Sequence, residues 1–305
     1  MVGDIYNDIR SGYTGGATDV YIPYGENVFL YDVNSLYPTV MANCPMPVGK
    51  PVFFEGNIRN KDKNAFGFFR VKMTTPENLE HPILQTKVQT SDGLRTVAPL
   101  GQWEDVIFSP EMDNAVKLAY KFEILSGYTF DQAYIFKDYI ENLYEIKQTH
   151  SKKDPMYLIS KLLMNSLYGR WAMDYELNKH FITKDLEPYL LKYNIIENID
   201  LGNGNMLLNC APLHVNEEYY PLEANVNMAI AAAITAYARI YMSNFKNNPN
   251  IKLLYTDTDS IAVLNPLDEE LIDKSIYPQY YPPPTFSVGL FFNLKKINDL
   301  VNKFD

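Results

Sequence analysis

The sequence predicts a protein of the α+β class. Short apolar runs that end in turn residues, such as VFLYD at 28–32, are typical of strands. Two segments, 156–172 and 224–245, have the length and composition of helices. Two apolar runs flank a short polar tip within 251–264, which is the pattern of a β-hairpin. With 305 residues, 47% of them hydrophobic, the chain can bury the core of one large or two modest domains.

The charge balance argues against a generally basic nucleic-acid coat protein. Lys and Arg number 27 against 37 Asp and Glu, a formal charge of −10, so any polyanion must bind to a local patch. Two Cys and four scattered His show no spacing typical of a thiol or zinc site. The longest apolar run, 228–238, falls well short of the ~18 residues that a membrane span needs. We therefore expect a soluble protein with no membrane partner and no readable targeting signal.

The first strand leads directly into a helix. Residues 28–32 predict a buried strand, and Pro38 suits the first turn of the helix that follows. Asp32 therefore stands in a strand-to-helix turn. Residues 51–125 mix short β-like runs, FGFFRVKM and GLRTVAPL among them, with turn residues, and they contain no repeat. We interpret this stretch as α+β.

A helical hairpin is expected next. Residues 131–149 and 156–172 have helical patterns and are separated by HSKKDP, whose last two residues can end one helix and begin the next. Residues 177–222 are polar and are expected to be irregular, with a hairpin turn at GNGN, 202–205. An Ala-rich helix over 224–245 then precedes the second hairpin.

Two carboxylates, Asp257 and Asp259, occupy the tip of the hairpin within 251–264. A single acidic turn of this kind is most often only a solvated turn. Between strands this apolar, however, the two side chains repel each other, and a bound Mg²⁺ would offset the repulsion. Asp32, at the end of another apolar strand, is the second candidate. If the two strands are neighbours, Asp32 and Asp259 meet and can hold two metal ions about 4 Å apart.

The segment KLLMNSLYGRW, 161–171, combines three kinds of side chain on one helical stripe: Lys161, Asn165 and Tyr168. The large side chains of the other faces are expected to face the core: Leu162, Leu163 and Leu167. A cation, an amide and an aromatic ring together suit a nucleoside triphosphate. The alternative is an ordinary amphipathic helix with a solvated polar face. Residues 147–170 favour the triphosphate, because they carry five Lys and Arg against one Asp in an acidic protein.

Three motifs now resemble those of the family B DNA polymerases and follow the order of that family. DVNSLYP, 32–38, resembles the first carboxylate motif, D-x-x-S-L-Y-P. KLLMNSLYG, 161–169, resembles the fingers motif, K-x-x-x-N-S-x-Y-G, and YTDTDS, 255–260, resembles the second carboxylate motif, Y-x-D-T-D-S. YTGG, 13–16, is similar to the Y-x-G-G element that precedes the palm in the protein-primed subgroup. A flexible Gly-Gly turn is the alternative for that last element.

The resemblance implies a site for nucleotidyl transfer with two Mg²⁺ ions, Mn²⁺ being the alternative ion. The implied metal ligands are Asp32, Asp259 and the main chain of Val33, with Asp257 as a supporting catalytic carboxylate. Tyr37 would pack under the incoming sugar and exclude a 2′-hydroxyl. The implied nucleotide-binding residues are Val33, Tyr37, Lys147, Lys161, Asn165 and Tyr168. The implied DNA-binding residues are Tyr13, Gly15, Gly16, Ser35 and Gly169.

The resemblance also implies a domain division. The expected parts are a connector with the Y-x-G-G element at 1–27, the first part of a palm with an insertion at 28–130, a fingers hairpin at 131–176, a second insertion at 177–222, the second part of the palm at 223–265 and the start of a thumb at 266–305. A preceding exonuclease domain and the K-x-Y element of a thumb are not found. We therefore expect a palm and fingers fragment without the exonuclease and most of the thumb.

The expected function is template-directed DNA synthesis, in which a primer hydroxyl attacks the α-phosphate of a dNTP. The expected partners are a DNA primer-template and dNTP, and whether a terminal protein primes the reaction stays open. One alternative is a catalytically inactive remnant that still binds nucleic acid. A metal-dependent phosphodiesterase is another, but it leaves Lys161 and Tyr37 without a role. A mitochondrial location, on an organellar plasmid, and a cytoplasmic one both stay open.

Overall fold

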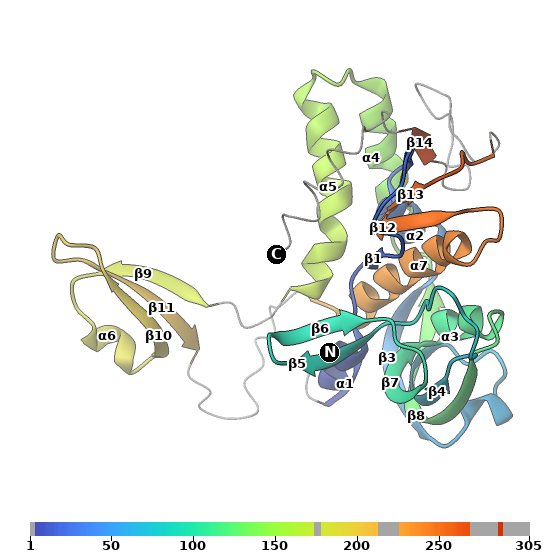
Figure 1. The fold of residues 1–305 in the computed structure, drawn as a ribbon. Helices are drawn as coiled ribbons and strands as arrows, with labels where there is room; N and C mark the ends of the chain where they lie inside the picture. The colour runs from blue at the N-terminus through green and yellow to red at the C-terminus, as the bar shows by residue number, and fades with distance from the viewer. Residues whose placement is uncertain (1–3, 174–177, 213–225, 269–285, 289–305) are drawn as a thin grey trace.

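The computed structural model describes residues 4–173, 178–212, 226–268 and 286–288, and it has the α+β architecture that the sequence predicts (Figure 1). The helices are α1 (Asp4–Gly12), α2 (Leu36–Asn43), α3 (Ser109–Val116), α4 (Lys137–Thr149), α5 (Pro155–Ala172), α6 (Glu187–Leu190) and α7 (Met228–Lys246), with a 3₁₀ turn, η1, at Ile58–Asn60. The strands are β1 (Thr18–Val20), β2 (Phe29–Val33), β3 (Met46–Glu55), β4 (Gly67–Thr74), β5 (Thr86–Thr90), β6 (Gly93–Val97), β7 (Gln102–Phe108), β8 (Lys121–Ala133), β9 (Lys179–Thr183), β10 (Tyr193–Asp200), β11 (Met206–Pro212), β12 (Leu253–Asp257), β13 (Ser260–Val263) and β14 (Phe286–Val288). Among these residues no helix is both long enough and apolar enough to cross a lipid bilayer.

A five-stranded antiparallel sheet unites the two ends of the described chain. Its order is β1-β12-β13-β2-β14, so the predicted hairpin β12–β13 lies between two strands from the N-terminal part. In β2 the side chains of Tyr31 and Val33 are buried, whereas Asp32 between them is exposed. This alternation follows from the period of two along a strand, and it turns Asp32 to the face opposite the core.

Helix α7 is the central element of the main hydrophobic core. It contacts α1, α2, α3 and α5, and most of its side chains are buried along its whole length. Small Ala side chains allow these neighbouring helices to approach α7 closely. The N-terminus of α7 is capped by a side chain. The side chain of Asn227 accepts hydrogen bonds from the N–H groups of Ala229 at 3.1 Å and Ile230 at 3.4 Å. The predicted helix over 224–245 thus begins later, because Asn227 defines its start.

A second, four-stranded sheet with the order β3-β8-β4-β7 covers a separate core. Phe69, Val71 and Met73 of β4 are all buried there and alternate with more polar neighbours. The two β-like runs noted in the sequence correspond to β4 and β6. Strands β5 and β6 form a two-stranded hairpin of their own.

The helical hairpin differs from its prediction at one end. Helix α5 matches the expected range, and Asp154 caps it by accepting a hydrogen bond from the Met156 N–H at 2.9 Å, with Pro155 in the first turn. Helix α4, by contrast, begins only at Lys137, because β8 continues through Ala133. Pairing of β8 with β3 and β4 outweighs the local helical pattern of 131–136.

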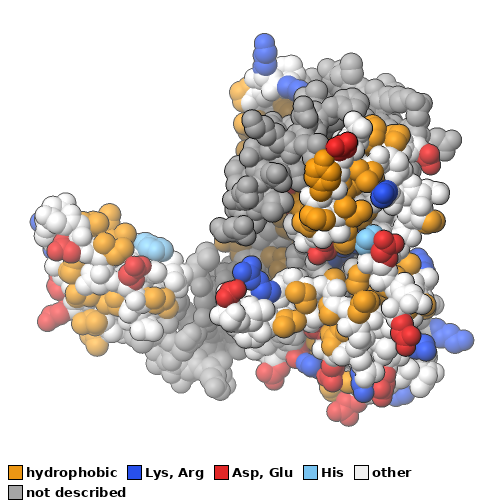
Figure 2. Space-filling view, viewed as in Figure 1, with side chains coloured by type: hydrophobic (Ala, Val, Ile, Leu, Met, Phe, Trp, Pro, Cys, Tyr) orange, Lys and Arg blue, Asp and Glu red, His pale blue; other side chains and the backbone are white. Residues whose placement is uncertain are grey.

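The expectation of an irregular segment at 177–222 is wrong for residues 178–212. They form a small lobe, a three-stranded sheet with the order β10-β11-β9 and the short helix α6 (Figure 1). The predicted turn at 202–205 is confirmed, because the Leu201 N–H donates to the Asn205 carbonyl at 3.0 Å. Figure 2 shows hydrophobic side chains gathered on this lobe, and Ile182, Ile196 and Ile199 are among its exposed residues. Strands β9 and β10 bury almost none of their side chains, so the alternating apolar pattern that indicates a strand is weak in this stretch.

Two further predicted parts of the chain, the thumb region and the connector, lie partly outside the described residues. Of the expected thumb region, 266–305, the structure describes only 266–268 and strand β14. In the expected connector, 1–27, α1 buries Tyr6 and Ile9 in the main core, and β1 is an edge strand of the five-stranded sheet. Helix α1 is therefore packed into the same core as α7.

We expect the Asn227 cap to contribute measurably to the stability of α7. Asn227→Ala removes the acceptor for two N–H groups and should lower the free energy of unfolding by about 1 kcal/mol. Asn227→Ser keeps a capping oxygen and should retain most of that free energy. Urea unfolding followed by circular dichroism measures both variants. If both variants lost the same free energy of unfolding, the side-chain oxygen of residue 227 would not be the stabilising group.

Candidate active site

Two carboxylates meet where strands β2 and β13 lie side by side. Asp32 pairs with Ser260 across the two strands, and the Val33 N–H donates to the main-chain carbonyl of Asp259 at 2.8 Å. Asp259 itself lies in the two-residue turn between β12 and β13, and Asp257 ends β12. The structure therefore brings together the three predicted carboxylates and Val33, all on one end of the five-stranded sheet.

The electrostatics of these carboxylates show mutual repulsion. Desolvation, then the charge of Asp32 and finally that of Asp257 raise the pKa of Asp259 to about 6. Desolvation also raises the pKa of Asp32, and the Lys161 ammonium opposes that rise. Like charges at a strand end are costly, so the folded chain holds an arrangement that a cation would stabilise.

The donor set fits a hard divalent cation. Asp32 on β2 and Asp259 in the adjoining β12–β13 turn offer carboxylate oxygens, and the main chain of Val33 is hydrogen-bonded to that of Asp259. Mg²⁺ prefers such oxygen ligands and keeps several water molecules, so it needs only one or two protein carboxylates. Among the described residues no cluster of three or more His, Cys, Asp or Glu side chains is placed to hold a metal. The suitability of this site for a divalent cation therefore depends on the pair Asp32 and Asp259, whose repulsion a bound ion would remove.

Three tyrosines form an aromatic surface beside the carboxylates. The rings of Tyr37 in α2 and Tyr168 in α5 stack with centroids 4.2 Å apart and an interplanar angle of 9°. Burial raises the pKa of Tyr37, and the neighbouring Tyr168, Asp259 and Tyr13 raise it further. Burial and the nearby Tyr168 likewise raise the pKa of Tyr13. Tyr13 and Tyr37 therefore stay neutral, and the three side chains present flat, largely apolar rings near Asp259.

Two lysines of the helical hairpin lie on the same side of the site. Desolvation lowers the pKa of Lys147 in α4, and the positive charges of Lys161 and Lys152 lower it further. Lys161 also acts on the pKa of Asp32, so its charge reaches both the carboxylates and the second lysine. The ammonium of Lys147 lies over the Tyr144 ring, 5.2 Å from its centroid. Lysines that repel each other at this site favour an anionic ligand.

Helix α5 divides into three faces, and one prediction about it is wrong. Lys161 and Asn165 are exposed on the predicted stripe, with Tyr168 partly buried at the stack. The buried face is made by Ser160 and Met164. Two side chains expected in the core are instead exposed, Leu162 at 57% and Leu163 at 44%. Among the described elements, α5 contacts mainly α2, α4 and α7, which leave Leu162 and Leu163 exposed.

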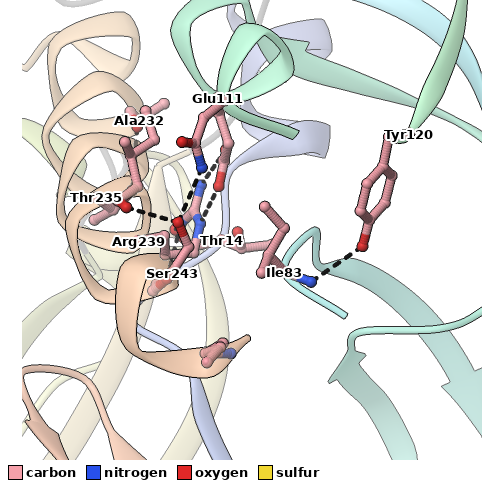
Figure 3. A network of polar contacts seen from close by, with 12 residues as sticks. Thr14, Ile83, Glu111, Tyr120, Ala232, Thr235, Arg239 and Ser243 are labelled. Atoms are coloured by element: carbon pink, nitrogen blue, oxygen red, sulfur yellow. Dashed lines mark hydrogen bonds and ion pairs between the residues drawn. The ribbon is translucent and has the colours of Figure 1, made fainter. Parts of the chain in front are cut away.

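The loop with the Y-x-G-G element, 13–16, is held by a buried ion pair that the sequence analysis missed. Arg239 of α7 pairs with Glu111 of α3 through two hydrogen bonds, Nε to Oε1 at 2.7 Å and Nη2 to Oε2 at 2.8 Å (Figure 3). Its Nη1 donates to the main-chain carbonyls of Thr14 at 2.7 Å and Gly15 at 2.8 Å. Both charged side chains are under 10% exposed. The signal was available, because Arg239 is the only charge inside α7 before the terminal Lys246.

The two glycines of this loop have different surroundings. A Cβ at Gly16 would lie 2.6 Å from the Thr258 side chain, whereas a Cβ at Gly15 or Gly169 would meet nothing within 4 Å. Gly16 is therefore needed for the close approach of this loop to the carboxylate turn. Ser35 and Thr258, next to the two carboxylate strands, both have left-handed backbone angles, with φ of 54° and 55°. Such conformations are costly for residues with a Cβ and occur often at functional sites.

Sequence comparison identifies relatives of this chain. The sequence profile of a family described as DNA polymerase type B, organellar and viral, matches residues 1–251. A probable DNA polymerase of Neurospora intermedia is 40% identical over 279 residues, covering 88% of this chain and 28% of that protein. A probable DNA polymerase of Ascobolus immersus is 38% identical, covering 97% of this chain and 24% of that protein. The chain thus spans roughly a quarter of the length of these two relatives.

Structural comparison gives the same fold. Phi29 DNA polymerase, solved as a ternary complex with primer-template DNA and incoming nucleotide substrates, superimposes with a TM-score of 0.65 and 19% sequence identity. The match covers 98% of this chain and 57% of the phi29 chain. The predicted fold class, with its antiparallel sheet and helical hairpin, is therefore confirmed as that of part of a polymerase.

We expect Asp259→Asn to stabilise the metal-free protein at neutral pH. The pKa of Asp259 is raised to about 6 from 3.8, so its ionised form opposes folding above that range and not below pH 4. The variant should gain about 1 kcal/mol of unfolding free energy at pH 7.5, after allowance for solvent screening, and nothing at pH 4. Thermal unfolding in EDTA at both pH values measures this, with the exposed turn residue Asp92→Asn as control. Stability that fell at pH 7.5 in Asp259→Asn would contradict the repulsion.

Proposed function

Because the chain belongs to the type B DNA polymerases of organelles and viruses, we propose that it forms the catalytic palm and fingers of such an enzyme and performs template-directed DNA synthesis. The observation that carries this proposal is the convergence of three groups from distant parts of the chain. The Asp32–Asp259 pair lies beside Lys161, whose charge acts on Asp32, and beside the stacked rings of α2 and α5.

The lysines are proposed to bind the triphosphate of an incoming dNTP. Lys161 influences the pKa of Asp32 on one side and of Lys147 on the other, so positive potential extends from the carboxylates toward α4. A triphosphate needs several cationic partners, and point charges on flexible stems suit it. Asn165, exposed one turn along α5 from Lys161, is proposed to contact the same nucleotide.

The aromatic surface is proposed to receive the sugar and base. Tyr37 and Tyr168 stack nearly flat, so their exposed edges form one rigid surface instead of two independent rotors. Tyr37 would lie under the deoxyribose, and Tyr168 would contact the nascent base pair. Primer-template contacts are proposed for Tyr13, Gly15, Gly16, Ser35 and Gly169.

Asp32, Asp259 and the main chain of Val33 are proposed to hold Mg²⁺, or Mn²⁺ as the alternative. When bound, such ions lower the pKa of an attacking hydroxyl and neutralise a leaving pyrophosphate. The protein contributes rigidity, because Asp32 lies on β2 and the turn with Asp259 is hydrogen-bonded to the main chain of Val33 next to it. It also contributes charge, since at pH 7.5 a carboxyl with a pKa of about 6 is mostly ionised.

The proposed ligands are a DNA primer-template and dNTP. The phi29 structure that shares the fold was solved with both kinds of ligand, which supports the proposal without assigning contacts to this chain. Priming by a terminal protein stays a prediction. The organellar branch of the family and the fungal relatives support replication of an organellar element, so a mitochondrial location is the one we propose.

Primer extension tests the proposed function. The purified chain with primer-template, dNTP and Mg²⁺ should add nucleotides, and Asp32→Asn or Asp259→Asn should lower addition at least a thousandfold without loss of fold. Asp257→Asn should be milder, and Asp92→Asn should match the wild type. A wild-type chain that binds the primer-template but adds nothing would identify the inactive remnant instead. Near-normal extension by Asp259→Asn would make the carboxylate assignment wrong.

Tyr37 is expected to discriminate against ribonucleotides. Tyr37→Val shortens the side chain under the proposed sugar position and should admit a 2′-hydroxyl, raising rNTP incorporation relative to dNTP at least tenfold. Single-nucleotide addition assays with dNTP and rNTP measure the ratio. Tyr139→Val, at an exposed position of α4, is the matched control. If Tyr37 is only a packing residue, the variant will lose stability and keep its selectivity.

A further inference from the structure

A hydroxyl on the edge strand β1 contacts the third carboxylate of the site. Thr18 pairs with Asp257 across strands β1 and β12, and its Oγ1 donates to Asp257 Oδ1 at 3.0 Å. The Thr258 hydroxyl donates to the same oxygen at 3.3 Å. Thr18 and Asp257 lie 239 positions apart in the sequence, so this contact exists only in the folded sheet. An exposed carboxylate otherwise rotates freely, and these two donors fix one of its oxygens.

Main-chain contacts hold β1 tightly against the carboxylate turn. The Thr258 N–H donates to the Ala17 carbonyl at 3.0 Å, and Gly16 allows the Thr258 side chain to approach the chain just before β1. Just beyond the other end of the strand, the Tyr21 N–H donates to the Leu254 carbonyl at 2.8 Å. Thr258 has a left-handed backbone, which a β-branched residue adopts only where the surroundings enforce it. β1 supplies part of that enforcement.

Two buried cations of α7 contact β1 and the loop before it and fix their position. Lys246 Nζ lies 3.3 Å from Asp19 Oδ2, and its side chain is 3% exposed. Tyr21 donates from its hydroxyl to the same oxygen at 3.3 Å. Arg239, two turns earlier on the same side of α7, holds the carbonyls of Thr14 and Gly15. The segment from Thr14 to Asp19 is therefore attached to α7 at both ends.

We propose that Thr18 is a positioning residue for the carboxylate of Asp257, and that Arg239 and Lys246 set its place by fixing β1 on α7. The proposal rests on the proposed function, because it takes Asp257 as a carboxylate of the nucleotidyl-transfer site. Thr18 fixes the Asp257 carboxylate through Oδ1, at the end of β12 that leads into the turn with Asp259. Partners of this kind typically change metal affinity or activity by about 10- to 100-fold when removed.

Thr18→Val, which replaces the hydroxyl by a methyl group of similar size, tests the role. We expect the half-saturating Mn²⁺ concentration, measured by electron paramagnetic resonance, to rise about tenfold, with a comparable loss in kcat for nucleotide addition. Thr18→Ser should restore both quantities, and the melting temperature should change little. Thr96→Val, at an exposed position of β6, is the matched control and should behave as the wild type.

A double-mutant comparison separates positioning from a general effect on the sheet. In the Asp257→Ala background, Thr18→Val should have no further effect on Mn²⁺ binding or kcat, because Ala has no side-chain oxygen for the Thr18 hydroxyl to hold. Lys246→Met should speed amide hydrogen exchange at Thr258, whose N–H donates to Ala17, and weaken Mn²⁺ binding in parallel. Equal losses from Thr18→Val in both backgrounds, or none in either, would overturn the proposal.

The Mn²⁺ measurement also distinguishes this inference from the proposed function. A wild-type chain that binds Mn²⁺ and shows the expected pattern among the variants, yet adds no nucleotide, supports the positioning role and refutes polymerase activity. A wild-type chain that extends primers while Thr18→Val binds Mn²⁺ normally overturns the positioning role alone. A wild-type chain that binds no Mn²⁺ overturns both.

Discussion

The geometry of this molecule depends on the hydrogen bonds that the guanidinium of Arg239 makes. A buried cation is unstable without partners, and here four hydrogen bonds, two to Glu111 and two to carbonyls of 14–15, compensate for its desolvation. The pair with Glu111 spans 128 positions, so it joins α3 of the first half to α7 of the second. By holding the loop before β1 as well, one side chain sets the distance between the core helix and the edge of the five-stranded sheet.

In the carboxylate site, this rigidity keeps two repelling side chains close together and so lowers the stability of the metal-free protein. Asp32 lies on β2 and Asp259 in the adjoining β12–β13 turn, and desolvation together with repulsion from Asp32 raises the pKa of Asp259. A looser structure would let the two side chains move apart and relieve the repulsion. The sheet prevents this, because Val33 and Asp259 are joined in the hydrogen-bond ladder. Sites of this kind exchange stability of the empty protein for affinity toward the ligand that neutralises them.

The sequence predicted the features that short motifs or local periodicity determine. Asp32, Asp259 and the β12–β13 hairpin belong to such patterns, and the structure places them together. A lone charge within α7 marks Arg239 as a residue that needs a partner, but local patterns identify neither its partner nor that of Thr18, because both partners lie more than 100 positions away. Helical periodicity also could not tell which apolar face of α5 the protein covers, so Leu162 was expected in the core and is exposed. The lobe of 178–212 was missed because each of its strands buries few side chains.

The order of strands in the five-stranded sheet has a consequence for biosynthesis. β1 and β2 leave the ribosome well before the hairpin that pairs with both, which is among the later described elements. Until β12 and β13 are made, the two early strands have unpaired main-chain groups, which attract other chains. α7 precedes the hairpin in the chain and supplies the apolar surface on which β2 can already pack. The hairpin inserts between strands that were synthesised more than 200 residues before it. Until then, a growing polypeptide has no carboxylate pair and is most in need of chaperones.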